Sequence, residues 1–348
     1  MSIEPTIIEG FAIETIERLI FTVKGIVHPP DRVIAYLRYA PDPTGDRQRA
    51  GIRYRRVYRF DEQQTILQAR FPHYAPPLPD PILGIPVQAV PRMAIQRIYD
   101  PRQRLTEIRS TAPADSLEAD ACDLIEMLCV ESGIPVTDLG ITGSLLLGLH
   151  TAASDLDLIV YGIASARVVH RTLRRLLDDP SPQAPIRRLD RRQLRDLHAT
   201  HRPDTPLSLE EFVHHQSRKV NEFRFRELAC FIRFVPTPNE VGERYGERRY
   251  APIGPATVRA RVTDDRLAIF TPCRYGVDGA TLVDGTPLPD LREIVSFRGR
   301  FSDQARRGEW VVGRGALERV MDGSGADYCR LVVGGRAGEY LAAEVQNG

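Results

Sequence analysis

Residues 141–162, ITGSLLLGLHTAASDLDLIVYG, constrain the fold more than any other stretch of this sequence. They contain a Gly-Ser pair, then ten residues, then Asp155-Leu156-Asp157 at the start of an apolar run. A carboxylate on a buried strand is costly unless a partner compensates for its lost hydration. Residues i and i+2 of a strand share a face, so Asp155 and Asp157 point the same way and repel each other. The pattern therefore indicates a cation at the end of this strand.

The residues around the acidic pair predict a strand-turn-helix-strand unit, from the segments DLGIT, GS, LLLGLH and DLDLIVYG. Glycine lets the backbone approach a ligand, and free N–H groups at a helix start can hold a phosphate. Magnesium takes one or two carboxylates together with waters and phosphate oxygens. An isolated Asp-x-Asp is common and a lone Gly-Ser is often a simple cap, but their combination favours a binding site. We expect Asp155 and Asp157 to ligate Mg²⁺ or Mn²⁺, and Gly143 and Ser144 to hold nucleotide phosphates.

The combination resembles the nucleotidyltransferase superfamily of DNA polymerase β. That family carries hydrophobic-Gly-Ser, about a dozen residues, then Asp-hydrophobic-Asp-hydrophobic, which here are residues 142–144 and 155–158, with Gly148 at a position where many members have glycine. The similarity covers residues 136–162 closely and about 100–235 more loosely. It implies a small mixed sheet with helices and a two-metal transfer of a nucleoside monophosphate from an NTP. In such chemistry the metals activate the attacking hydroxyl and stabilise the leaving pyrophosphate.

The third carboxylate of that family has no counterpart at its usual place, within hydrophobic-Asp-hydrophobic-Arg on a later strand. The best local match, ACFIRFVP, puts Phe231 there. Glu227 has the same strand parity but lies ~13 Å away along a strand, so it substitutes only if the strand shifts or bulges. Glu222 is the other candidate. Two interpretations stay open: the match is displaced and the chain is an active nucleotidyltransferase, with Glu227 or Glu222 as its third acid, or the chain is a catalytically weakened or inactive member that binds nucleic acid or acts in assembly.

Basic residues gather in two regions. Residues 167–202 contain ten arginines and four aspartates, and RQRAGIRYRRVYRF interleaves arginine with aromatic residues. Both regions fit nucleic-acid contact, and both also fit solvated surfaces in which arginine stems cover apolar groups. Lys219 and Arg233 flank the predicted pocket strand, and we expect them to contact phosphate.

Three parts are predicted, in an α+β or α/β multidomain fold: a β-rich domain over 1–88, a nucleotidyltransferase core over 89–236, and a β-rich domain over 237–348 whose late strands resemble those of an OB-type barrel. Strands are expected throughout residues 1–70. Six prolines between Pro72 and Pro86 predict a linker. Helices are expected over 91–110, over 116–132 with Ser116 as N-cap and Gly133 as stop, and after Ser208, where Glu211 completes a capping box.

The composition of the chain bears on its partners, its location and the metals that it can bind. The formal net charge is +1, which gives no global electrostatic argument for a nucleic-acid partner. No apolar run approaches the ~20 residues of a membrane-spanning helix, and the N-terminus has no secretory signal pattern, so a cytoplasmic protein without membrane contact is expected. None of the five cysteines lies in a C-x-x-C pair, which disfavours a zinc site. The expected partners are an NTP and, as acceptor, RNA or DNA.

Overall fold

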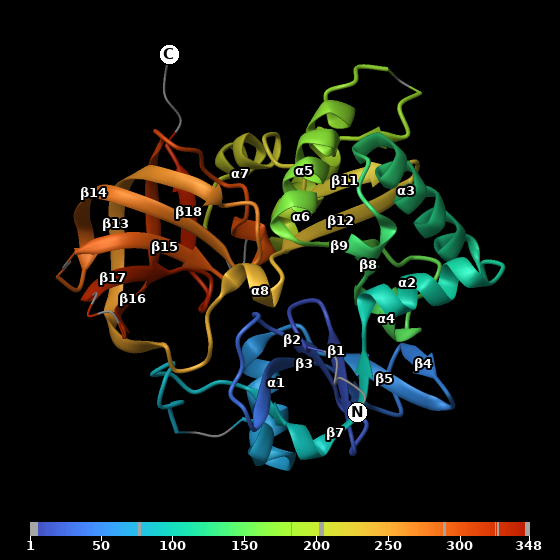
Figure 1. Ribbon diagram of the computed structural model, residues 1–348, viewed down its shortest axis with the longest axis horizontal. Helices are drawn as coiled ribbons and strands as arrows, with labels where there is room; N and C mark the ends of the chain where they lie inside the picture. The colour runs from blue at the N-terminus through green and yellow to red at the C-terminus, as the bar shows by residue number, and fades with distance from the viewer. Residues whose placement is uncertain are drawn as a thin grey trace. The chain divides into compact units, whose positions relative to one another are not determined.

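The structure, a computed structural model, describes residues 6–75, 78–181, 183–201, 205–287, 290–323, 325 and 327–344. It is a mixed α/β protein whose strands form three sheets (Figure 1). The chain divides into two compact units. The first comprises Met1–Pro81, Ile85–Val169 and Val235–Tyr245, and the second comprises Ile82–Gly84, His170–Phe234 and Gly246–Gly348. The three predicted parts do not coincide with these units, and that division stays a prediction.

The first unit begins with a seven-stranded sheet in the order β4-β5-β3-β2-β1-β7, with β6 beside β3. Its core is aliphatic and aromatic, with Phe11, Phe21 and Leu37 fully buried. The β1–β7 pair is antiparallel and sets Ile13 opposite Ile98. The strands are β1 (Ala12–Thr15), β2 (Ile20–Val23), β3 (Arg32–Pro41), β4 (Arg47–Arg49), β5 (Ile52–Arg56), β6 (Ala89–Pro91) and β7 (Ile95–Tyr99).

Two predictions for this region are wrong. The strands do not continue to residue 70, because Phe60–Arg70 forms helix α1, followed by the 3-10 turn η1 (Pro72–Tyr74). Only Gln63 and Leu67 of α1 are buried, so the sequence carries little helical periodicity. The helix expected over 91–110 begins only at Pro101, since the residues before it form the 3-10 turn η2 (Arg92–Ala94) and β7.

Two helices then lead into the predicted strand-turn-helix-strand unit. Helix α2 (Pro101–Ser110) starts at Asp100, whose side chain accepts a hydrogen bond from the Arg102 N–H. Helix α3 (Ser116–Ser132) ends at Gly133 as predicted, but its N-cap is Asp115 rather than Ser116. The unit itself consists of β8 (Leu139–Ile141), α4 (Gly143–Leu147) and β9 (Leu156–Tyr161), preceded by the 3-10 turn η3 (Val136–Asp138) and followed by α5 (Ile163–Leu177).

The second unit contains a small antiparallel arrangement of three strands. β10 (Ile186–Arg187) pairs with β11 (Glu222–Phe225), and β11 pairs with β12 (Leu228–Val235). Between β10 and β11 lie the helices α6 (Arg191–His201) and α7 (Leu209–Gln216). The capping box predicted at Ser208 and Glu211 is confirmed. A further short helix, α8 (Pro238–Val241), belongs to the first unit.

The rest of the second unit is a closed barrel, the orange and red part of Figure 1. Five strands pair in the order β13-β14-β15-β17-β16, and β13 also pairs with β16, which closes the ring. The β15–β17 pair is parallel, and β18 adds to β16. The elements are β13 (Arg248–Leu267), β14 (Cys273–Gly285), β15 (Leu291–Ser296), η4 (Gly299–Phe301), β16 (Trp310–Asp322), β17 (Asp327–Val332) and β18 (Tyr340–Ala343).

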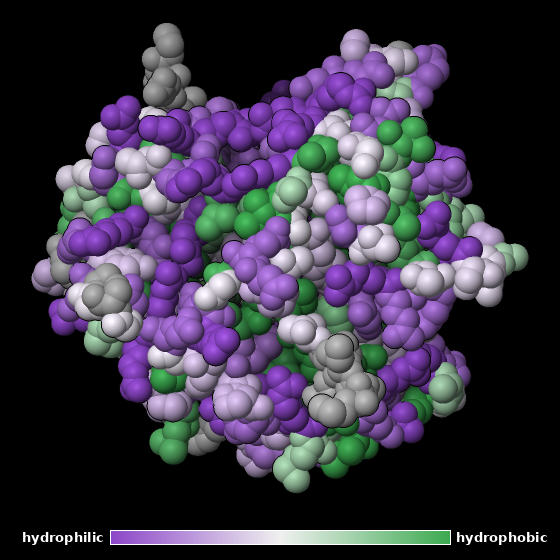
Figure 2. Space-filling view, in the orientation of Figure 1, coloured by the Kyte–Doolittle hydropathy of each residue, from purple (hydrophilic) through white to green (hydrophobic). Residues whose placement is uncertain are grey.

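The face shown in Figure 2 is covered mainly by hydrophilic residues, with apolar residues in smaller groups between them. Large apolar side chains that are exposed include Ile16, Met93 and Val130. Exposed apolar residues of this kind are ordinary on protein surfaces. Within the described ranges, no helix combines the length and apolar character needed to cross a bilayer.

Candidate functional site

The Gly-Ser turn and the Asp-x-Asp strand are in direct contact within the first unit. β8 and β9 are antiparallel, with Ile141 opposite Leu158. The Thr142 N–H donates to the backbone oxygen of Asp157 at 2.8 Å. Gly143 has a φ of 65°, and a Cβ built on it would lie 2.0 Å from Oδ2 of Asp157. Only glycine therefore allows the Asp157 carboxylate to lie against the backbone of the turn.

The two aspartates lie at the start of β9, Asp155 just before the strand and Asp157 as its second residue. Leu156 and Leu158 are fully buried, whereas Asp157 is half-buried and Asp155 is exposed. Among the described residues, Asp155 has no hydrogen bond or ion pair through its side chain. Ser144, also half-buried, follows Gly143 in the first turn of α4. The structure thus brings the predicted residues to one accessible end of the β8–α4–β9 unit.

Arginines from other elements hold the end of α4. A five-residue helix leaves most of its carbonyl groups without partners inside the helix. Positive charge is also favourable near a helix C-terminus. The carbonyl oxygens of Leu145, Leu147 and Leu149 accept hydrogen bonds from Arg104 at 3.2 Å, Arg49 at 2.8 Å and Arg47 at 3.3 Å, respectively.

Arg47 also fixes the loop that delivers Asp155. Its side chain is 7% exposed, and its guanidinium donates to Oγ1 of Thr151 at 3.0 Å and to Oγ of Ser154 at 3.2 Å. Ser154 Oγ accepts a further bond from the Thr151 N–H at 2.9 Å. Because Ser154 directly precedes Asp155, Arg47 positions the first acid of the pair. Sequence reasoning missed this role, since no local pattern links Arg47 to a loop about one hundred residues later.

The position matched to the third carboxylate lies on β12 in the second unit. Glu222 and Phe231 are direct cross-strand partners. The ring of Phe231 packs against Gly299, where an added Cβ would lie 2.8 Å from the ring. The guanidinium of Arg233 lies 5.7 Å from the centre of the same ring. An aromatic residue, packed against backbone, therefore stands where the family resemblance places an acid.

Glu227 lies at the turn between β11 and β12. Its side chain is 88% exposed and forms ion pairs with Arg187 at 3.0 Å and Arg224 at 3.2 Å. Exposed pairs of this kind contribute little to stability. A catalytic role for Glu227 stays a prediction.

Lys219 is a buried cation of the second unit, with 5% of its surface exposed. Its ammonium donates to the backbone oxygen of Arg300 at 2.6 Å. Burial lowers the pKa of Lys219 to about 8, although the charges of Glu222 and Asp303 oppose this shift. Burial likewise raises the pKa of Glu222, whose Oε2 accepts a hydrogen bond from Gln216 at 3.1 Å. The contact of Lys219 with phosphate stays a prediction, and the cavity beside it was not foreseen.

The donor set suits one divalent ion that is shared with a ligand. Across the described part of the chain, no three His, Cys, Asp or Glu side chains come together to hold a metal. Asp155 and Asp157 supply carboxylate oxygens, the ligand type that Mg²⁺ prefers, and Mg²⁺ commonly completes its shell with waters and phosphate oxygens. The two carboxylates therefore match the ligand type of Mg²⁺, with the other ligands to come from water or a bound molecule.

Comparison with known proteins finds a similarity that extends over nearly the whole chain. The chain is 29% identical over 330 residues to a protein of Methanocaldococcus jannaschii described as uncharacterized protein MJ1086, and the alignment covers 92% of this chain and 94% of that protein. No protein-family model matches the chain, and no solved structure matches it significantly. The similarity extends over both units and carries no functional description.

We predict that Gly143→Ala destabilises the protein more than the matched variant Gly133→Ala. Both glycines have positive φ, 65° and 71°, which costs an alanine about 1–2 kcal/mol. Only at Gly143 does the added methyl meet a carboxylate, and displacing it costs about 1–3 kcal/mol more. Denaturant unfolding measures both variants. Equal losses would show that the turn does not depend on contact with Asp157.

We predict that Arg47→Met lowers the free energy of unfolding by about 1–3 kcal/mol, because the oxygens of Leu149, Thr151 and Ser154 each lose the hydrogen bond from Arg47. Arg56→Met is the matched control, since its side chain forms a 3.5 Å surface ion pair with Asp46 and contacts Tyr58 through a hydrogen bond and the ring. Amide hydrogen exchange at Thr151 should accelerate in Arg47→Met alone. Unchanged exchange there would contradict the positioning role of Arg47.

A further prediction concerns acid stability. His215 is buried, and burial, together with the charges of Lys219, His214 and Arg218, lowers its pKa from 6.5 to about 3. Between these values the unfolded chain binds the proton and the folded chain does not, so stability falls as the pH falls below 6.5. From pH 7 to pH 5, wild type should lose about 2 kcal/mol more than His215→Phe. Parallel pH profiles in denaturant unfolding would refute this assignment.

Proposed function

We propose that the β8–α4–β9 unit binds a magnesium-nucleotide complex, and that the protein transfers a nucleoside monophosphate from an NTP to an acceptor, with a nucleic acid favoured. The observation that supports this proposal most is the contact between Gly143 and the Asp157 carboxylate. It joins the two halves of the motif, which are separated by ten residues in the sequence, at one accessible end of the unit. The proposal includes a polymerase β-like core for this part of the chain.

Each residue of the unit has a distinct task in this proposal. The backbone at Gly143 and the hydroxyl of Ser144 contact the phosphates, because the glycine lets a ligand approach closely. Asp155 and Asp157 hold Mg²⁺, which neutralises phosphate charge when it is bound. Arg47 keeps Asp155 in place through the loop that precedes it. The attacking hydroxyl would lose its proton to an acceptor outside this pair.

A second candidate function is nucleic-acid binding or assembly without catalysis. The packing of Phe231 against Gly299, at the position matched to the third acid, favours it. The closed five-stranded ring of β13 to β17 also favours it, because OB-type barrels of five strands often bind oligonucleotides. Fold likeness alone is a weak argument for function, so this remains the alternative.

The proposal predicts pyrophosphate release from at least one NTP when Mg²⁺ or Mn²⁺ and an acceptor from total RNA, DNA or protein are present. Asp157→Asn and Asp155→Asn should each reduce release at least 100-fold, because the metal loses half of its carboxylate ligands. Asp196→Asn, at an exposed position on α6, is the control and should retain wild-type release.

Two results would count against the proposal. Wild-type release by Asp157→Asn would show that the acidic pair does not hold the metal. Absence of release, combined with RNA or DNA retention that persists in EDTA and weakens steeply with salt, would establish the second candidate instead.

A further inference from the structure

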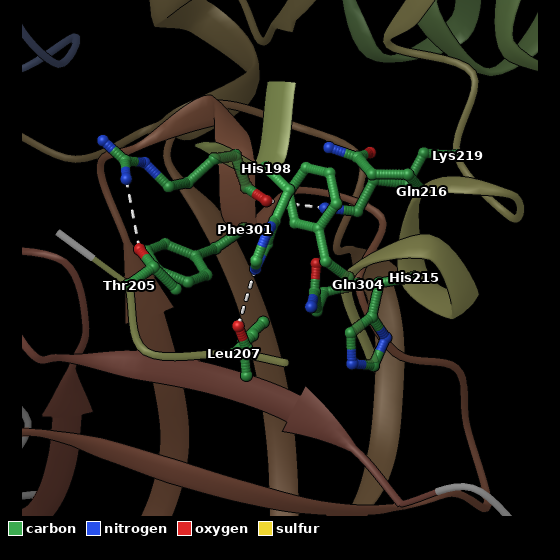
Figure 3. A pocket seen from close by; sticks show the side chains of 10 residues that line it. His198, Thr205, Leu207, His215, Gln216, Lys219, Phe301 and Gln304 are labelled. Carbon is green, nitrogen blue, oxygen red and sulfur yellow. Dashed lines mark hydrogen bonds between the residues drawn. The ribbon is translucent and has the colours of Figure 1, made fainter. Parts of the chain in front are cut away.

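The second unit contains a small cavity, lined mostly by apolar surface with a few polar side chains, that no part of the proposed function uses. Its volume is about 20 Å³, which admits a few oxygen-sized atoms but not a nucleotide. Figure 3 shows the side chains around it, which come from α6, the segment between α6 and α7, α7, the segment after α7, η4 and Gln304. Its polar lining includes His198, His215, Lys219, Arg300 and Gln304.

Two buried side chains of this lining have hydrogen-bonding atoms without a partner among the described residues. His215 is 2% exposed, and neither of its ring nitrogens is hydrogen-bonded. Gln304 is 3% exposed, and its Oε1 has no donor. Its Nε2 donates to the Leu341 carbonyl at 2.9 Å, which fixes the orientation of the amide. Buried polar atoms in proteins nearly always have a partner, so these atoms indicate a ligand or ordered water.

Lys219 adds a positive charge to the same cavity. Its ammonium has three N–H groups, of which one donates to the Arg300 carbonyl. Lys219 is also unusual for this chain, because only two of its 47 Lys and Arg residues are lysines, the other being Lys24. An ammonium is a compact point charge, and it fits a small cavity better than the planar guanidinium of arginine. Glu222 and Asp303 also act on this charge, but two of the ammonium N–H groups remain for the acceptor oxygens of a small bound species.

We propose that this cavity binds a small oxyanion that carries a proton, of the chemical type of hydrogen phosphate or bicarbonate. The anionic oxygens accept hydrogen bonds from Lys219 and from the N–H of neutral His215. The remaining proton of the anion donates to Oε1 of Gln304. A fully deprotonated anion such as sulfate satisfies the donors but leaves the Gln304 oxygen unpaired.

This site is independent of the magnesium-nucleotide proposal, because its residues all belong to the second unit and need no divalent ion. Its test therefore runs in EDTA, where nucleotidyl transfer is absent. If no anion binds at this cavity, the proposal for Asp155 and Asp157 is unaffected. If the protein transfers no nucleotide, the anion proposal is likewise unaffected.

The two lysines allow a direct experiment on the full-length protein. Lysine labelled with ¹³C at Cε gives one NMR signal for Lys24 and one for Lys219. Titration at pH 7 with inorganic phosphate, and separately with bicarbonate, should shift the Lys219 signal saturably and leave the Lys24 signal in place. The anion that saturates at the lower concentration is the better ligand. Sulfate should bind at least about 5-fold more weakly, because of the unpaired Gln304 oxygen.

Variants then test the named residues by calorimetric titration with the better anion. Lys219→Met and Gln304→Glu should each weaken binding at least 10-fold, the first by removing a charge and the second by adding a repelling one. Lys24→Met is the matched control and should bind as wild type does. The proposal is overturned if neither anion shifts the Lys219 signal, which would leave the cavity to water alone, or if sulfate binds as tightly as the better anion.

Discussion

The close contact between the Asp157 carboxylate and the Gly143 backbone is the constraint on which the candidate site depends. A carboxylate on a strand with buried neighbours must keep access to water or to a cation. Here only the start of β9, with Asp155 just before it and Asp157 within it, remains accessible, while the other residues of the strand are buried on both faces. The left-handed glycine removes the one side chain that would displace the carboxylate. The Gly143 turn thus combines a backbone without a side chain with a nearby carboxylate charge.

Arginine side chains donate several of the hydrogen bonds that hold the residues around this turn. The basic strand β4 fits a nucleic-acid surface when only the sequence is considered. In the structure its two arginines, Arg47 and Arg49, donate to carbonyl oxygens at and after the end of α4. Such contacts satisfy acceptors that a five-residue helix leaves open. The first unit therefore uses these cations to fix the loop before Asp155. Their presence on a strand is not by itself a sign of a polyanion partner.

Local signals explain what could be predicted from the sequence. The β8–α4–β9 unit, the stop at Gly133 and the capping box at Ser208 depend on residues a few positions apart, and all three are present. Helix α1 escaped prediction because its apolar pattern is weak. Residues 95–99 form a strand because they pair with β1, a partner more than eighty positions earlier. The contacts of Arg47 and the cavity beside Lys219 likewise depend on long-range packing, which no spacing in the sequence reveals.

Electron paramagnetic resonance of Mn²⁺ tests the central claim most directly, because it reports the bound metal without any knowledge of the acceptor. In the presence of an NTP, the protein should remove one equivalent of Mn²⁺ from the free signal beyond what the nucleotide removes alone. Asp155→Asn and Asp157→Asn should abolish this extra binding. Extra binding that persists in both variants, or that is absent from wild type with every NTP, would contradict the assignment of the acidic pair as a metal-nucleotide site.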